Sequence, residues 1–201
     1  MKKLDIAKLN KTYTSLDGQN VKVAGWTRSV RDSKNFGFID LNDGTSFKGA
    51  QIVFEADKIP NYDSVAKLNA GSSIIVDGTV AITPSNKQPY EIKATNIEII
   101  CPTDNTYPLQ KKGHSVEFLR EQAYLRPRTN LFNAIFRIRS EAAFALHKYF
   151  NEQGFVYVHA PLLTSSDCEG AGELFKVSTQ EIYDGKKLYP EDELFGKKVY
   201  L

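Results

Sequence analysis

Cysteine is scarce in this chain of 201 residues, and so are the marks of a secreted or membrane protein. Cys101 and Cys168 lie far apart without the spacing of metal ligands, which argues against a disulfide scaffold and a zinc finger. No apolar run approaches the roughly 18 residues that a membrane span needs. Residues 1–8 lack the apolar stretch and cleavage site of a secretory leader. We therefore expect a cytoplasmic protein with no membrane partner.

An excess of one charge is also missing, because Lys and Arg total 26, Asp and Glu total 24, and the net charge is +2. Residues 1–104 and 105–201 have the same balance of basic and acidic side chains. Any contact with nucleic acid must therefore depend on a local patch rather than on a basic tail. The three histidines show no ligand spacing, so we expect no metal site.

The first half of the chain contains five segments that alternate apolar and polar side chains, which is typical of half-buried strands. These segments are residues 21–30, 35–41, 49–54, 73–80 and 90–100. A short stretch with helical spacing, around residues 62–68, lies between the third and the fourth. This order predicts an all-β, five-stranded OB-fold barrel, a fold that binds oligonucleotides on the face of its early strands.

The second half of the chain has a different pattern of apolar side chains. Residues 101–112 contain two prolines and no periodicity, which is typical of a linker. Apolar spacing predicts a helix over 115–125 and a long amphipathic helix over 131–153, capped by Thr129 or Asn130 and ended by Gly154. Residues 155–158 are predicted to form a strand. We divide the chain into a barrel domain (1–104), a linker or hinge (105–125) and a second domain (126–201), which the resemblance described next implies is incomplete.

Residues 134–175 carry a family resemblance. The long helix and residues 154–163 are similar to motif 1 of the class II aminoacyl-tRNA synthetases. Residues 164–175, Thr-Ser-Ser-Asp-Cys-Glu-Gly-Ala-Gly-Glu-Leu-Phe, resemble the asparaginyl-tRNA synthetases. Upstream, Gly25-Trp26 and residues 38–43 resemble the anticodon-binding OB domain of the same subgroup. The resemblance implies an OB-fold barrel followed by the truncated start of an α+β class II catalytic domain.

The resemblance also implies an activity. ATP, L-asparagine and tRNA-Asn would be converted to AMP, diphosphate and Asn-tRNA-Asn by a homodimer that associates through motif 1. The family holds ATP and Mg²⁺ with its motifs 2 and 3, which are absent before Leu201. We therefore expect this chain to be the N-terminal portion of such an enzyme. By itself it should have no catalytic residue, no cofactor and no activity.

Three residues match those that hold the anticodon in the related aspartyl subgroup: Arg31, Phe38 and Gln51. Phe38 can stack on a base, Gln51 offers a donor and an acceptor to a base edge, and Arg31 offers a planar charge. Each of the three residues also has an interpretation that involves no ligand. Phe38 could belong to the core, Gln51 could simply point outward, and Arg31 could pair with Asp32 at the surface.

Glu169 matches the family glutamate that meets the α-amino group of the amino acid substrate. A carboxylate is a natural partner for an ammonium group. The alternative is a solvated loop residue without a ligand.

Two other functions are open. A stand-alone OB-fold module would bind RNA without catalysis, but it has no use for a motif 1 segment. An aspartate–tRNA ligase would share the overall plan, but the flank at residues 165–168 argues against it.

Overall fold

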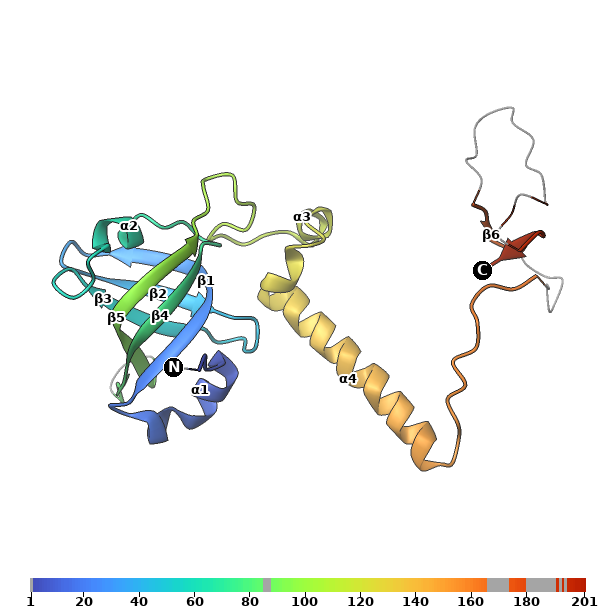
Figure 1. Ribbon diagram of the computed structural model, residues 1–201, viewed down its shortest axis with the longest axis horizontal. Coiled ribbons are helices and arrows are strands. Elements are labelled where there is room, and N and C mark those ends of the chain that lie inside the picture. Colours follow the sequence, from blue (N-terminus) through green and yellow to red (C-terminus); the bar gives the residue numbers. More distant parts are fainter. Residues whose placement is uncertain (1, 85–87, 166–173, 180–190, 192, 194) are drawn as a thin grey trace. The chain divides into compact units, whose positions relative to one another are not determined.

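The structure is a computed structural model, and it describes residues 2–84, 88–165, 174–179, 191, 193 and 195–201. The chain divides into two compact units, Met1–Ala142 and Ala143–Leu201 (Figure 1). The first unit contains the barrel and the connection that follows it. Each unit is described separately below.

A closed five-stranded barrel makes up most of the first unit (Figure 1). Its strands are β1 (Asn20–Asp32), β2 (Phe36–Asn42), β3 (Ala50–Glu55), β4 (Ser73–Ile82) and β5 (Tyr90–Cys101). They close in the order β1-β2-β3-β5-β4, and the short helix α2 (Tyr62–Ala66) connects β3 to β4. The prediction of an OB-fold barrel is confirmed, and all five strands lie within two residues of their expected bounds.

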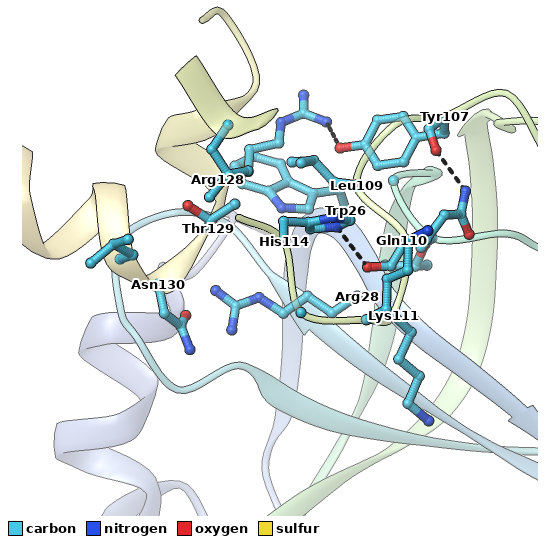
Figure 2. Close-up of a pocket in the computed structure, with 17 residues that line it drawn as sticks. Trp26, Arg28, Tyr107, Leu109, Gln110, Lys111, His114, Arg128, Thr129 and Asn130 are labelled. Carbon is cyan, nitrogen blue, oxygen red and sulfur yellow. Dashed lines mark hydrogen bonds between the residues drawn. The ribbon is translucent and has the colours of Figure 1, made fainter. Parts of the chain in front are cut away.

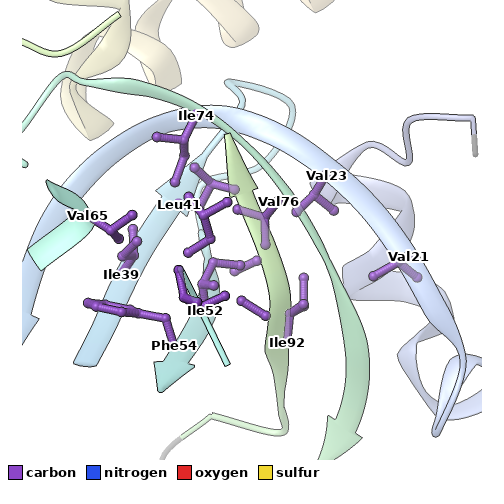
Figure 3. Packing of buried hydrophobic residues seen from close by; sticks show 14 of the residues in the cluster. Val21, Val23, Ile39, Leu41, Ile52, Phe54, Val65, Ile74, Val76 and Ile92 are labelled. Atoms are coloured by element: carbon purple, nitrogen blue, oxygen red, sulfur yellow. The ribbon is translucent and has the colours of Figure 1, made fainter. Parts of the chain in front are cut away.

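The barrel core follows from the alternation of side chains along each strand. On β2, Gly37, Ile39 and Leu41 are buried, whereas the side chains between them point outward. Figure 3 shows Ile39 and Leu41 packed with residues from the other strands, among them Ile52 of β3 and Ile92 of β5. Burying one such side chain contributes about 1.5–3 kcal/mol. The alternation leaves every second side chain of β1, β2 and β3 on the outer face.

Barrel closure depends on one parallel pairing. β3 and β5 run parallel, with Ile52 beside Ile92 and Val53 beside Lys93, whereas the other paired barrel strands are antiparallel. This register also places Gln51 and Glu91, the two preceding residues, at the same level of the sheet.

An N-terminal helix, α1 (Ile6–Thr12), was not predicted from the sequence. Its apolar signal is short, but Ile6 and Leu9 are fully buried in the barrel core. The loop after β2 holds the helix start, because the Ile6 amide donates to Asp43 Oδ2 (2.9 Å) and the Ala7 amide to Thr45 Oγ1 (3.0 Å). A 3-10 turn, η1 (Tyr13–Leu16), then leads into β1.

Beyond the barrel, α3 (Val116–Glu121), η2 (Arg126–Arg128) and α4 (Asn130–Glu152) confirm the two predicted helices. The Phe132 amide donates to Thr129 Oγ1 (3.4 Å) at the start of α4. Gly154 has the predicted left-handed conformation (φ 86°), and the Phe155 amide closes the helix on the Phe150 carbonyl (3.0 Å). No helix in the described part of the chain is long and apolar enough to cross a bilayer.

The strand predicted at residues 155–158 is wrong. These residues adopt no regular structure, although their side chains favour strands, and all four are exposed. A strand needs a neighbour that accepts its backbone hydrogen bonds. Among the described residues, the sheet of the second unit contains only β6 (Lys176–Val177) and β7 (Val199–Tyr200), which pair with each other.

Candidate nucleic-acid interface

The three residues proposed to hold an anticodon lie on one outer face of the barrel, on neighbouring strands. Arg31 of β1 is directly opposite Phe38 of β2, and Phe38 is opposite Val53 of β3. Gln51 lies two residues from Val53 on the same face, opposite Asp40. Phe38 and Gln51 are half-buried and Arg31 is exposed. Because Phe38 is absent from the barrel core, the structure removes the objection that it serves only for packing.

Phe38 and Gln51 share an open hollow of about 590 Å³, here called the β2–β3 hollow. It is lined by Asn35, Phe36, Phe38, Gln51, Val53, Glu55, Asp57 and Glu91. Phe36 and Phe38 meet edge to face, with 5.5 Å between their ring centroids. An aromatic wall beside polar groups suits a flat ring that is stacked on one side and hydrogen-bonded at its edge.

Gly37 sets the depth of this wall. A Cβ atom at this position would lie 2.3 Å from Phe54 Cζ in the core and 2.8 Å from the Arg31 carbonyl oxygen. Only glycine therefore lets β2 approach the core closely between the outward-facing Phe36 and Phe38. The backbone of β2 thus presents Phe36 and Phe38 side by side.

The β2–β3 hollow is acidic. Glu55, Asp57 and Glu91 line it, and none of its described lining residues is Lys or Arg. The sequence analysis did not single out Glu91. The alternation along β5 does indicate that Glu91 points outward, because it lies between two buried residues. The sequence does not reveal that β3 pairs with β5, and this pairing places Glu91 beside Gln51. Carboxylates accept hydrogen bonds from base N–H groups and repel phosphates, so this hollow suits bases rather than the RNA backbone.

Asp40 lies beside the hollow under the influence of two arginines. Burial raises the pKa of the Asp40 carboxyl above its ordinary value, and the nearby charges of Arg28 and Arg31 oppose that rise. A Cβ at Gly49 would lie 2.0 Å from Asp40 Oδ1, so the carboxyl packs against the backbone that leads into β3. Arg31 forms no ion pair within the described parts of the chain, so its charge stays available to a ligand.

A second hollow, of about 570 Å³, lies in the first unit between β1 and the segment from Tyr107 to Leu131. Its lining contains Arg28, Lys111, Lys112, His114 and Arg128, and no Asp or Glu. We call it the basic hollow. Figure 2 shows Arg28, Lys111 and Arg128 around it. None of the four Lys and Arg side chains forms an ion pair with a described residue. A cluster of basic side chains without ion-pair partners attracts phosphates.

The wall of the basic hollow is fixed by contacts between the barrel and the segment after it. The Arg128 guanidinium lies over the Trp26 ring, 4.4 Å from its centroid, and donates to the Tyr107 hydroxyl (3.1 Å) (Figure 2). The Tyr107 ring covers Gly71, where a Cβ would approach it to 2.5 Å. Arg128 is therefore occupied within the protein, and the half-buried Arg28 donates to the Phe47 carbonyl (3.2 Å), whereas Lys111 and Lys112 are exposed and can meet a ligand.

Glu169, expected to meet an amino acid substrate, lies outside the described residues. Within the described ranges, no group of three or more His, Cys, Asp or Glu side chains could hold a metal ion.

Comparison with known protein families gives one match in each half of the chain. Residues 21–100 match the family described as "OB-fold nucleic acid binding domain". Residues 115–197 match the family described as "tRNA synthetases class II (D, K and N)". The chain therefore combines an OB-fold nucleic acid binding domain with part of a class II tRNA synthetase domain of the D, K and N group.

Individual relatives narrow this further. An asparagine–tRNA ligase of Acetivibrio thermocellus is 59% identical over 165 residues, which are 82% of this chain and 36% of that protein. One of Alkaliphilus metalliredigens is 51% identical over 210 residues, covering 100% of this chain and 44% of that protein. The chain belongs to the asparagine–tRNA ligase family, and it spans less than half the length of these relatives.

A solved structure shows the same fold. The asparaginyl-tRNA synthetase from Pyrococcus horikoshii, in complex with asparaginyl-adenylate, superposes with a TM-score of 0.80 at 23% identity. The match covers 100% of this chain and 42% of that chain. The predicted arrangement, an OB-fold barrel followed by part of a class II synthetase domain, is confirmed.

Proposed function

We propose that this chain supplies the anticodon-recognition part of an asparagine–tRNA ligase. The whole enzyme converts ATP, L-asparagine and tRNA-Asn to AMP, diphosphate and Asn-tRNA-Asn. The observation that carries this proposal is the outer face of the barrel, where Phe38, Gln51 and Arg31 share one surface next to an acidic hollow. The names of the relatives give the amino acid and the tRNA.

The chemistry of the β2–β3 hollow suits a GUU anticodon. The half-buried Phe38 ring gives one base a stacking platform, which is worth about 1–3 kcal/mol. The Gln51 amide matches uracil, which presents both an N–H donor and carbonyl acceptors. The Glu91 carboxylate, at the level of Gln51, can accept from the N–H groups on the Watson–Crick edge of guanine. Arg31, exposed at the rim, provides charge for the adjacent phosphate.

The basic hollow complements this surface. Arg28 and Arg31 both belong to β1 and both act on Asp40, so the basic hollow begins where the base-reading face ends. We propose that Lys111 and Lys112 hold backbone phosphates of the same RNA. Such contacts increase affinity without reading sequence.

The remaining roles belong to the whole enzyme. We propose the functional boundaries 1–104 for anticodon binding, 105–125 for the hinge and 126–201 for the start of the catalytic domain. Glu169 would meet the α-amino group of L-asparagine. ATP and Mg²⁺ would be held by family motifs that this sequence does not contain. The enzyme would act in the cytoplasm as a homodimer formed through the motif 1 region.

Neither alternative is favoured. A stand-alone OB-fold module does not explain the match of residues 115–197 to class II synthetases. An aspartate–tRNA ligase does not explain relatives at 51–59% identity that are named asparagine–tRNA ligases.

The test measures RNA binding by the purified chain carrying Phe38→Ala. The probe is a fluorescent anticodon stem-loop with the sequence GUU, and a GUC stem-loop measures specificity. Loss of base stacking should weaken GUU binding by about 1–3 kcal/mol, with the circular dichroism spectrum unchanged. Phe195→Ala removes an exposed phenylalanine far along the chain and serves as the matched control. Unchanged GUU binding by a folded Phe38→Ala protein would contradict the proposal.

A further inference from the structure

The turn that joins β1 to β2, residues 33–35, is held by backbone hydrogen bonds, among them Ser33 amide to Phe36 carbonyl (2.8 Å), and by one side chain, the Asp32 carboxylate. Asp32 Oδ1 accepts from the Lys34 amide (3.0 Å) and from the Tyr62 hydroxyl (2.5 Å). Lys34 has a positive φ of 70°, which is unusual for a side chain other than glycine and requires support from its surroundings. The Asp32 carboxylate provides that support from one side, and Tyr62 anchors the carboxylate from the other.

Tyr62 is anchored in the barrel rather than at its surface. It begins α2, and its ring packs on the fully buried Phe54 with 5.1 Å between centroids. Phe54 in turn lies against Gly37 at the start of β2. Burial, followed by the hydrogen bond to Asp32, raises the pKa of Tyr62 to about 12, so the phenol remains a donor at every physiological pH. Tyr62 does not line the β2–β3 hollow.

Asp32 and Arg31 are consecutive residues at the end of β1, so their side chains point to opposite faces of the strand. The Asp32 Oδ1 atom is engaged by a phenol and an amide, which fixes the end of the strand that carries Arg31. The same turn leads into Asn35 and Phe36, which form one rim of the β2–β3 hollow. Arg31 and Phe36 are thus both positioned by a turn that Tyr62 holds.

We propose that Tyr62 is a positioning residue for RNA binding: through Asp32 it steadies the β1–β2 turn, and with it the end of β1 that carries Arg31 and the Asn35–Phe36 rim. This inference rests on the proposed function, because it assigns Arg31 and the hollow to RNA. Tyr62 itself touches no base and no phosphate.

The first experiment compares Tyr62→Phe with a matched control, Tyr90→Phe. Both variants keep a buried ring and lose one hydroxyl, but the Tyr90 hydroxyl donates to Asn10 Oδ1 (2.7 Å), away from the turn. We expect Tyr62→Phe to weaken binding of the GUU stem-loop by about fivefold, as for residues coupled in one network. Tyr90→Phe should bind as the wild type does. Equal losses in both variants, or no loss in Tyr62→Phe, would overturn the proposal.

A second set of measurements distinguishes a positioning role of Tyr62 from a general loss of protein stability. In an Arg31→Gln background, Tyr62→Phe should reduce affinity by roughly twofold or less, because much of its effect passes through Arg31. Hydrogen exchange of the Lys34 amide should accelerate in Tyr62→Phe and remain unchanged in Tyr90→Phe. Full additivity of the two substitutions would refute the link to Arg31.

The two proposals fail in different ways. If Phe38→Ala and Arg31→Gln leave stem-loop binding unchanged, the anticodon proposal fails, and the role of Tyr62 in RNA binding fails with it. If those two variants bind weakly while Tyr62→Phe binds normally, only the positioning proposal fails. Lys34 exchange then shows whether the turn itself depends on Tyr62.

Discussion

Asp40 is a carboxylate placed where RNA would be bound, and its charge works against both folding and binding. It lies on the outer face of β2 opposite Gln51, and Arg28 and Arg31 of the neighbouring strand both attract it. Burial outweighs these two attractions, because the pKa of Asp40 is raised. The charged form is therefore destabilised in the folded protein, while it partly neutralises two arginines that could hold phosphates.

The raised pKa of Asp40 predicts the direction in which stability changes with pH. Between the ordinary value of 3.8 and the raised value, the folded protein binds more protons at Asp40 than the unfolded chain does, so stability falls as pH rises. Asp40→Asn removes this penalty. It should increase the free energy of unfolding at neutral pH and have a smaller effect below pH 3.8, as measured by urea unfolding at both pH values. Asp63→Asn, at an exposed carboxylate, is the control and should give no gain. An equal gain at both pH values would contradict the assignment.

At the scale of elements, the two hollows separate the reading of bases from the holding of the backbone. The β2–β3 hollow has three carboxylates and an aromatic wall, whereas the basic hollow has five basic side chains and no acidic one. Base contacts specify a sequence, and phosphate contacts increase affinity for any sequence. Substitutions in the two hollows should therefore have different signatures.

The loop before α3 offers a direct test of that difference. The double variant Lys111→Gln/Lys112→Gln should weaken binding of a complete tRNA-Asn transcript, and of one with an altered anticodon, by the same factor. The slope of log affinity against log salt should fall by about 1 for each lost phosphate contact. Lys67→Gln, which removes an exposed lysine elsewhere on the barrel, should leave the slope unchanged. A loss confined to the GUU anticodon would show that these lysines read sequence, contrary to the proposal.

How far the sequence predicted these elements depended on whether the signal was local. Alternation along β1 to β5 predicted the strands, whereas Phe38 and Gln51 came from the family resemblance, which left open whether Phe38 belongs to the core. Strand partners are not local, so neither the position of Glu91 beside Gln51 nor the basic hollow was anticipated. The same reason explains the wrong strand at residues 155–158, whose β-branched and aromatic side chains favour a strand but have no described partner beside them. The α1 helix was missed because tertiary contacts with the loop after β2 hold it.

At the scale of the whole molecule, the second unit exposes an unusual amount of apolar surface. Along the part of α4 in this unit, Phe144, Leu146, Tyr149 and Phe150 are all exposed, by 49–67%. The chain after Gly154 folds back on the helix, with 5.5 Å between the Phe150 and Phe155 rings and 4.7 Å between His147 and Tyr157. These contacts leave a hollow of about 500 Å³ whose lining is mainly apolar and includes Leu146 and Val156. A helix covered on one side needs only a narrow apolar stripe. The additional exposed apolar side chains of α4 therefore indicate burial against another surface.

We expect that surface to be a second copy, because residues 130–161 resemble the motif through which class II synthetases form dimers. The alternative is that this apolar face packs on the catalytic sheet of the whole enzyme. The prediction concerns the whole enzyme. It should sediment as a dimer at micromolar concentration, and Leu146→Arg should raise the dimer dissociation constant at least tenfold, since a charge at a buried interface position costs roughly 2 kcal/mol or more. Glu152→Gln, an exposed change on the same helix, should leave the dissociation constant unchanged. Because a two-fold interface uses the same patch twice, one substitution removes two equivalent contacts, which favours a large effect. A wild-type enzyme that sediments as a monomer throughout a micromolar concentration series would refute the assignment of this surface to self-association.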